Sequence, residues 1–163
     1  MLKSIDKDYG CEIDVRSNGD KLILNHDPFQ PGVNLNKFLD HYSHGTLILN
    51  IKETGIEDIV IREVEKRKIK SFFLVDVEYP FLIKNLNNNK KNIAVRFSEF
   101  ESIENVIQFK NKYNWVWIDT VSKLPIKKSN FDILNSFKIC VVCPSLWNRT
   151  NQINNLKKML LKY

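Results

Sequence analysis

The sequence has few cysteines, namely Cys11, Cys140 and Cys143 among 163 residues. An odd number without the spacing of a disulfide framework fits a protein from a reducing compartment. Cys140 and Cys143 have the two-residue gap of a redox or zinc half-site, but they sit in or beside the apolar run 139–142. Cysteine in such a run usually behaves as a small core residue. Because no second Cys or His pair accompanies them, we do not expect a zinc site.

Long apolar runs are absent as well. No stretch approaches the roughly 20 apolar residues that a membrane-spanning helix needs. The first residues, Met-Leu-Lys-Ser, have none of the apolar character of an export segment. We therefore expect a cytoplasmic protein without a membrane span.

A long basic block is also missing, although the formal net charge is +6. The positive charge is spread over lysine pairs such as Lys90-Lys91, Lys127-Lys128 and Lys157-Lys158. Anionic partners are favoured electrostatically, but nothing localises the attraction. Nucleic-acid binding would need a basic stripe with exposed aromatics, and most aromatics here fall inside strand-like runs. We expect no nucleic-acid partner.

Strand-like and helix-like patterns alternate along the chain. Short apolar, β-branched runs predict strands at 11–16, 22–25, 47–52, 72–77, 93–97, 116–120 and 138–142. Apolar periodicity predicts helices at 35–42, 55–68, 79–86, 102–113 and 146–162. On the second helix, Glu63 and Arg67 have the spacing of an i,i+4 ion pair.

This alternation predicts an α/β fold with parallel neighbours and right-handed crossovers. About six parallel strands fall short of a closed eight-stranded barrel, which typically takes ~250 residues. We expect residues 1–163 to form a single domain, an incomplete TIM-type (β/α) barrel. Its open sheet edges must be covered or paired, which makes self-association through those edges an expectation.

One strand carries alternating charge. In an extended segment, Glu12, Asp14 and Arg16 project to one side while Ile13 and Val15 project to the other. Two carboxylates and a guanidinium on one face suit a hard cation beside a phosphate. A solvent-facing surface strand would have the same pattern, so the motif needs support from its neighbours.

A turn and a histidine supply that support. Asn18-Gly19 can take positive φ, so the chain is predicted to reverse and to pair the strand 22–25 beside the acidic strand. The reversal brings His26 close to Glu12 and Asp14. Parallel-sheet enzymes place their chemistry at strand ends, and the combination therefore predicts a functional site.

Together with Leu47-Ile-Leu-Asn-Ile-Lys52, these residues resemble the glycerophosphodiester phosphodiesterase family, in which Glu-x-Asp, His-Asp and Glu-Ile-Lys follow in this order. The matching positions are Glu12, Asp14, His26, Asp27 and Lys52. The stretches 93–101 and 115–119 look similar to a bacterial branch loosely associated with surface-polysaccharide gene clusters. The resemblance implies a barrel that cleaves a phosphodiester in lipid metabolism with the help of a metal.

Two departures from the family pattern stand out. The family opens with a strand bearing His-Arg-Gly, which is absent here, so half of the acid/base pair is missing. Asn50 stands where the pattern has a metal-binding glutamate. The domain is therefore expected to be truncated relative to the family, or a fragment of a longer protein.

The resemblance assigns the following roles. Glu12, Asp14 and Asn50 would hold Mg²⁺ or Ca²⁺, and His26 would move the proton. Lys52 would neutralise charge on a small phosphodiester substrate, with Arg16 as a second phosphate ligand. Among later strand-end residues, Asp119 is a candidate for the charge missing at Asn50. The alternative is a degenerate barrel that binds a phosphorylated ligand without turning it over.

Overall fold

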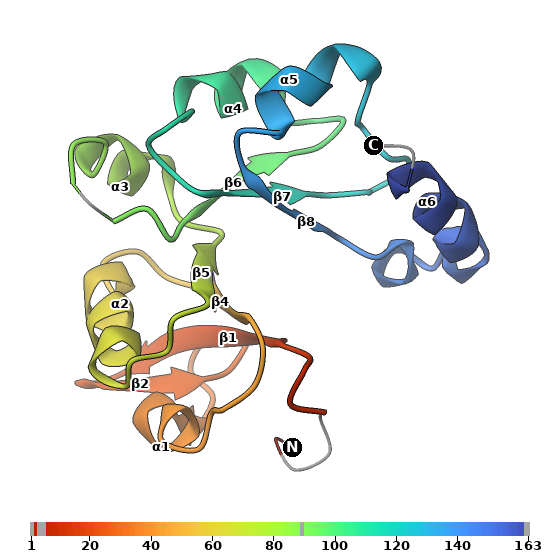
Figure 1. Ribbon diagram of the computed structural model, residues 1–163. Coiled ribbons are helices and arrows are strands. Elements are labelled where there is room, and N and C mark those ends of the chain that lie inside the picture. The colour runs from red at the N-terminus through yellow and green to blue at the C-terminus, as the bar shows by residue number, and fades with distance from the viewer. Residues whose placement is uncertain (1, 3–5, 89, 162–163) are drawn as a thin grey trace. The chain divides into compact units, whose positions relative to one another are not determined.

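A computed structural model describes residues 2, 6–88 and 90–161. Their contacts divide the chain into two compact units, 1–84 and 85–163, and each unit contains one β-sheet (Figure 1). The described residues thus form a mixed α/β fold with two sheets. No helix among them has both the length and the apolar character needed to span a membrane.

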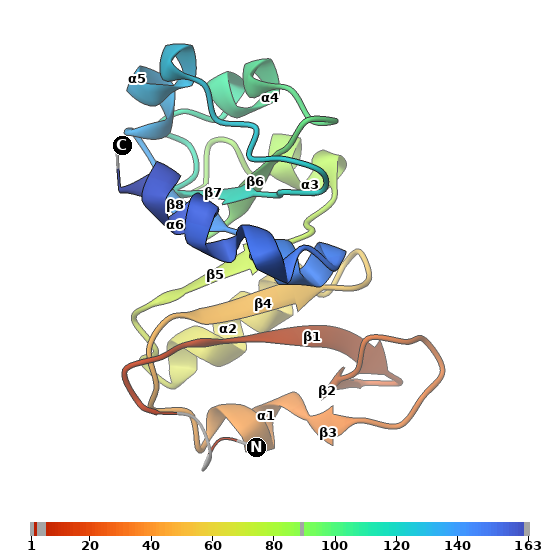
Figure 2. The same ribbon diagram turned by 90° about the vertical axis from the view of Figure 1, so that its right-hand side faces the viewer.

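The first unit is built on a five-stranded mixed sheet of order β3-β2-β1-β4-β5. Its strands are β1 (Cys11–Asn18), β2 (Lys21–Leu24), β3 (Val33–Asn34), β4 (Leu47–Ile51) and β5 (Phe72–Val75). Its helices are α1 (Leu35–Leu39), α2 (Glu57–Lys66) and α3 (Tyr79–Lys84). Figure 2 shows β1, β4 and β5 running side by side, with α2 behind them.

The register between β1, β4 and β5 and the alternation of side chains along each strand determine which residues share a face of the sheet. β1 and β4 are parallel with Asp14 opposite Asn50, and β4 continues into a parallel pair with β5. The predicted reversal after β1 is confirmed, because β2 pairs antiparallel with β1 across a turn in which Gly19 has φ +62°. Ile13 and Val15 are buried in the core, and this places Glu12 and Asp14 on the opposite face of the strand.

The second unit has a three-stranded parallel sheet of order β6-β7-β8. Its strands are β6 (Ala94–Phe97), β7 (Trp115–Ile118) and β8 (Lys138–Val141). Its helices are α4 (Ile103–Gln108), α5 (Phe131–Leu134) and α6 (Ile153–Leu160). In both views α4 and α5 lie over one side of this sheet (Figures 1 and 2).

The long C-terminal helix predicted for 146–162 is instead broken. Separate 3-10 turns occupy Pro144–Trp147 and Thr150–Gln152 before α6 begins at Ile153. Asn148 between the two turns has φ 57°, a left-handed conformation that a continuous helix does not accommodate. Residue 162 lies outside the described residues.

Two smaller expectations have different outcomes. The Glu63–Arg67 ion pair is confirmed, with 3.1 Å between Oε2 and Nη1. The prediction that both cysteines at the end of β8 are core residues is wrong for Cys143, which is exposed. That residue follows the strand and precedes the 3-10 turn at Pro144, so it lies beyond the packed part of the sheet.

Candidate active site

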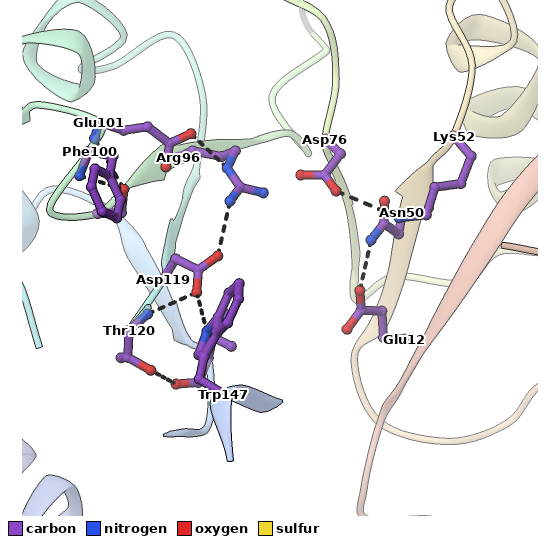
Figure 3. Close-up of polar contacts among 12 residues, drawn as sticks. Glu12, Asn50, Lys52, Asp76, Arg96, Phe100, Glu101, Asp119, Thr120 and Trp147 are labelled. Atoms are coloured by element: carbon purple, nitrogen blue, oxygen red, sulfur yellow. Dashed lines mark hydrogen bonds and ion pairs between the residues drawn. The ribbon is translucent and has the colours of Figure 1, made fainter. Parts of the chain in front are cut away.

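The candidate site lies in the first unit, where β1 runs beside the carboxyl ends of β4 and β5. The three strands are parallel neighbours, and Asp14 of β1 lies opposite Asn50 near the end of β4, at this edge of the sheet. Glu12 and Asp14 come from β1, Asn50 comes from β4, and Lys52 and Asp76 directly follow β4 and β5. Figure 3 shows Glu12, Asn50, Lys52 and Asp76 grouped at this edge.

Asn50 is the buried centre of the group. Its Nδ2 donates to Glu12 Oε1 over 3.0 Å, and the residue is only 7% exposed. Its Oδ1 is fully buried and has no hydrogen-bond partner among the described residues. A buried carbonyl oxygen without a partner is costly, because nothing replaces the water that it has lost. Asn50 therefore presents one free, desolvated oxygen beside a carboxylate.

Lys52 bridges two carboxylates. Its Nζ lies 3.3 Å from Asp14 Oδ1 and 3.8 Å from Asp76 Oδ2, and its side chain is 16% exposed. Asp76 has φ 57°, in the left-handed region that Asp tolerates better than most residues. Asp14 and Asp76 share this ammonium, and Glu12 adds a third carboxylate beside Asn50, so negative charge predominates at this edge.

Arg16 forms a hydrogen bond with the main chain of the segment that carries His26. Arg16 Nε donates to the His26 main-chain oxygen over 2.8 Å, while its Nη1 is 4.0 Å from Glu53 Oε2. The acidic strand is thus joined to the main chain of His26, as the hairpin predicts.

The His26 ring itself faces water. Its Nδ1 is 2.9 Å from Asp27 Oδ1, and the two side chains are 71% and 72% exposed. From the sequence, Asp27 is expected to orient either a backbone turn or the imidazole, and this contact is of the second kind. No hydrogen bond or ion pair between described residues joins the ring to Glu12 or Asp14.

The residues fit a weak cation site rather than a complete metal cage. Within the described ranges, no three His, Cys, Asp or Glu side chains are grouped so that they could hold a metal alone. The oxygen supply is instead mixed, combining the free Oδ1 of Asn50 with the carboxylates of Glu12 and Asp14. Mg²⁺ commonly uses one or two carboxylates and fills its other positions with water and substrate oxygens, so this set suits it.

Asp119 has a different environment within the second unit. Its Oδ2 accepts from Arg96 Nη2 at 3.0 Å, and its Oδ1 accepts from Trp147 Nε1 at 3.0 Å and from the Thr120 amide at 2.9 Å (Figure 3). Arg96 is held in turn by Glu101, with 2.7 Å from Nε to Oε1. Asp119 thus has donors on both oxygens, and nothing within its own unit marks it as the replacement ligand.

Sequence reasoning gave too little weight to one residue of the candidate site. Among the acids at later strand ends the sequence favoured Asp119, yet Asp76 is the second carboxylate partner of Lys52. Its position directly after the third parallel strand of the sheet is the signal that identifies it.

Known proteins offer no guide to this arrangement, since no family model matches the chain and searches of curated proteins and of solved structures found no significant match.

Proposed function

We propose that the strand ends of the first unit form the site of a metal-assisted phosphoric diester hydrolase acting on a glycerophosphodiester or a related small phosphodiester. One observation carries the proposal. The buried, unpartnered Oδ1 of Asn50 lies in a residue bonded to Glu12, at the sheet edge that also holds the Asp14–Lys52–Asp76 group. Oxygen ligands for a hard cation thus lie at the same strand ends as a cation for phosphate.

Glu12, Asp14 and Asn50 would hold Mg²⁺ or Ca²⁺. Such an ion polarises phosphoryl oxygens and orients the substrate. Lys52 would share Asp14 with this cation, and the excess of carboxylates over ammonium groups at this edge favours a second positive charge there.

Lys52 is the residue that binds the substrate phosphate. At 3.3 Å and 3.8 Å its two ion pairs are looser than direct charged hydrogen bonds, so a phosphate oxygen can compete for the ammonium. Its low exposure strengthens the interaction with charge that develops in the transition state.

Arg16 and His26 complete the proposed chemistry. Arg16 Nη2 has no partner among the described residues, so it can bind a second phosphate oxygen while Nε holds the His26 main chain. His26 either protonates the leaving alkoxide or takes the proton of the attacking hydroxyl, and Asp27 orients its ring.

The finer architecture belongs to the same proposal. Six strands have parallel neighbours, in the orders β1-β4-β5 and β6-β7-β8, and each strand is followed by helical structure, with β1 reaching β4 through the β2–β3 hairpin and α1. A strand order that increases along the chain in this way is expected of an incomplete TIM-type barrel. A single domain, the cytoplasmic location and self-association through sheet edges remain predictions.

A non-catalytic phosphate-binding module is the second candidate. It is favoured by the 71% exposure of the His26 side chain and by the amide at Asn50. General acid–base catalysis by one positioned residue contributes about 10²–10⁴-fold, so an imidazole left in solvent removes much of the expected rate.

Hydrolysis of bis(p-nitrophenyl) phosphate and of glycerophosphodiesters, with Mg²⁺ or Ca²⁺ and with EDTA, tests the two candidates. The hydrolase proposal expects metal-dependent turnover that both Glu12→Ala and His26→Ala diminish. Turnover that neither substitution changes contradicts the site. Metal-dependent binding of a glycerophosphodiester without turnover, lost in Glu12→Ala, identifies the binding module.

A further inference from the structure

The second unit contains a cavity that the proposed function does not use. Its volume is about 510 Å³, within the range of small-molecule sites. The lining combines polar and apolar groups, among them Thr120, Ser122, Lys123, Arg149, Leu156 and Met159. Leu156 and Met159 come from α6, whereas Thr120, Ser122 and Lys123 come from the segment after β7.

Arg149 is the unusual residue of this cavity, because only neutral oxygens bind its guanidinium. Nη1 donates to Ser122 O at 2.8 Å and to Gln152 Oε1 at 2.6 Å, and Nη2 donates to Thr120 O. No carboxylate among the described residues forms an ion pair with it. Glu99 approaches the same segment but accepts from the Ser122 amide instead.

Two of the five guanidinium N–H groups are therefore unused. The three hydrogen bonds occupy both hydrogens of Nη1 and one of Nη2, which leaves Nε–H and the second hydrogen of Nη2. Nε is buried and has no partner among the described residues. Nε and Nη2 form the edge of the guanidinium that binds an oxyanion through two parallel hydrogen bonds.

We propose that this cavity is a binding site for a small amphiphilic anion, whose carboxylate or phosphate pairs with Arg149 and whose short apolar chain lies against Leu156 and Met159. The anion supplies the charge that the guanidinium lacks. Lys123 also lines the cavity, with the Glu99 carboxylate close enough to interact with its charge. Contact between the apolar chain and the apolar lining removes both surfaces from water, and this favours binding. The inference does not depend on the function proposed for the first unit.

Calorimetric titration of the whole protein in EDTA tests this site, with octanoate, octyl phosphate, octanol and inorganic phosphate as probes. We expect the two amphiphilic anions to bind, and octanol and inorganic phosphate each to bind at least tenfold more weakly. The ratio of octanoate to octyl phosphate affinity identifies the preferred head group. The Glu12→Ala variant should bind them unchanged, which separates this cavity from the first unit.

Substitutions at three positions locate the binding. Arg149→Gln should weaken anion binding about 10- to 100-fold, the usual effect of losing a hydrogen bond to a charged group. Lys158→Gln removes the same charge from an exposed position outside the cavity lining and should change affinity less than twofold.

Substitutions at the third position, Met159, keep the test valid if Arg149→Gln does not fold. Met159 is 39% exposed and lines the cavity, so Met159→Glu should fold and repel the anion, whereas Met159→Gln should bind it normally. Equal affinity in the Glu and Gln variants overturns the proposal. So does equal binding of octanol and octanoate, or no binding of either anion at millimolar concentration.

Discussion

The polar groups at the strand ends of the two units differ in how completely their buried atoms are bonded. In the second unit, both oxygens of Asp119 accept hydrogen bonds, and the residue is 6% exposed. In the first unit, Asn50 is almost equally buried at 7%, but its Oδ1 has no partner among the described residues. The two residues are thus similarly buried, but both oxygens of Asp119 are hydrogen-bonded and the Oδ1 of Asn50 is not.

The difference separates a structural network from a candidate site. A satisfied buried network stabilises the fold and leaves nothing for a ligand. An unsatisfied buried atom costs stability, and a natural sequence retains such a cost most readily where function needs it. Asn50 in the first unit fits the second description, and so does Arg149 in the cavity of the second unit.

The variant with the largest expected effect tests whether the polar group of the first unit is a functional site. Lys52→Met should lower turnover of a phosphodiester about 10²–10³-fold, the usual cost of removing one preorganised group that stabilises transition-state charge. Stability should change little, because both carboxylate partners remain partly exposed to water. Steady-state kinetics and thermal unfolding measure the two quantities. A variant that unfolds while its residual turnover per folded molecule is normal reverses the assignment.

Asp119→Ala tests the structural half. It leaves the buried Thr120 amide without its acceptor, frees the Nε1–H of the partly exposed Trp147 and takes one partner from Arg96, so we expect a loss of about 2 kcal/mol in the free energy of unfolding. Urea denaturation measures this loss. Asp119→Asn, which keeps an acceptor, should lose less. Turnover per folded molecule should stay unchanged, and a selective loss of turnover would make Asp119 part of the site.

Asn50→Asp sharpens the comparison by adding a negative charge at the buried centre of the candidate site. Without metal the new carboxylate faces Glu12 and removes its donor, so stability should fall by about 1–2 kcal/mol. With Mg²⁺ or Ca²⁺ the loss should reverse, since an added charged ligand strengthens cation binding by about tenfold. Thermal unfolding with and without millimolar metal measures both effects. If metal leaves the melting temperature of both proteins unchanged, no cation binds at Asn50.

Much of the fold was predictable because it depends on local patterns. Alternation along 11–16 gave β1 and its two faces, and Asn18-Gly19 gave the reversal into β2. The hydrophobic runs of β4 and β5 gave buried parallel strands. The short strand β3 and helix α5 were missed, since two and four residues are too few for a periodic signal.

The candidate site was predictable in its residues but not in its contacts. Glu12, Asp14, Asn50 and Lys52 come together because strand order and parity place them at one edge. The direction of the His26 ring, 71% exposed, depends on the conformation of a loop, and no periodicity encodes that. Asn50 Oδ1 lacks a partner because no neighbouring group donates a hydrogen bond to it, and this depends on tertiary packing that the sequence pattern does not encode.

The ion pairs of Glu63 on helix α2 provide the smallest expected effect and complete the comparison. Glu63 is held by Lys66 at 2.6 Å and by Arg67 at 3.1 Å, and the hydrogen bond from Lys66 is the main cause that lowers the pKa of this carboxyl. A carboxyl whose pKa is lower in the folded protein stabilises it above the unfolded pKa and loses this contribution as the pH falls through the folded value. Glu63→Gln should therefore cost about 0.5 kcal/mol at neutral pH, typical of helical surface pairs, and nothing once the carboxyl is protonated in acid. Urea denaturation of both proteins across that range measures the difference. A cost that persists unchanged at low pH would mean that Glu63 acts through packing and not through its charge. In that case burial, rather than hydrogen bonding, would govern stability at this position of α2.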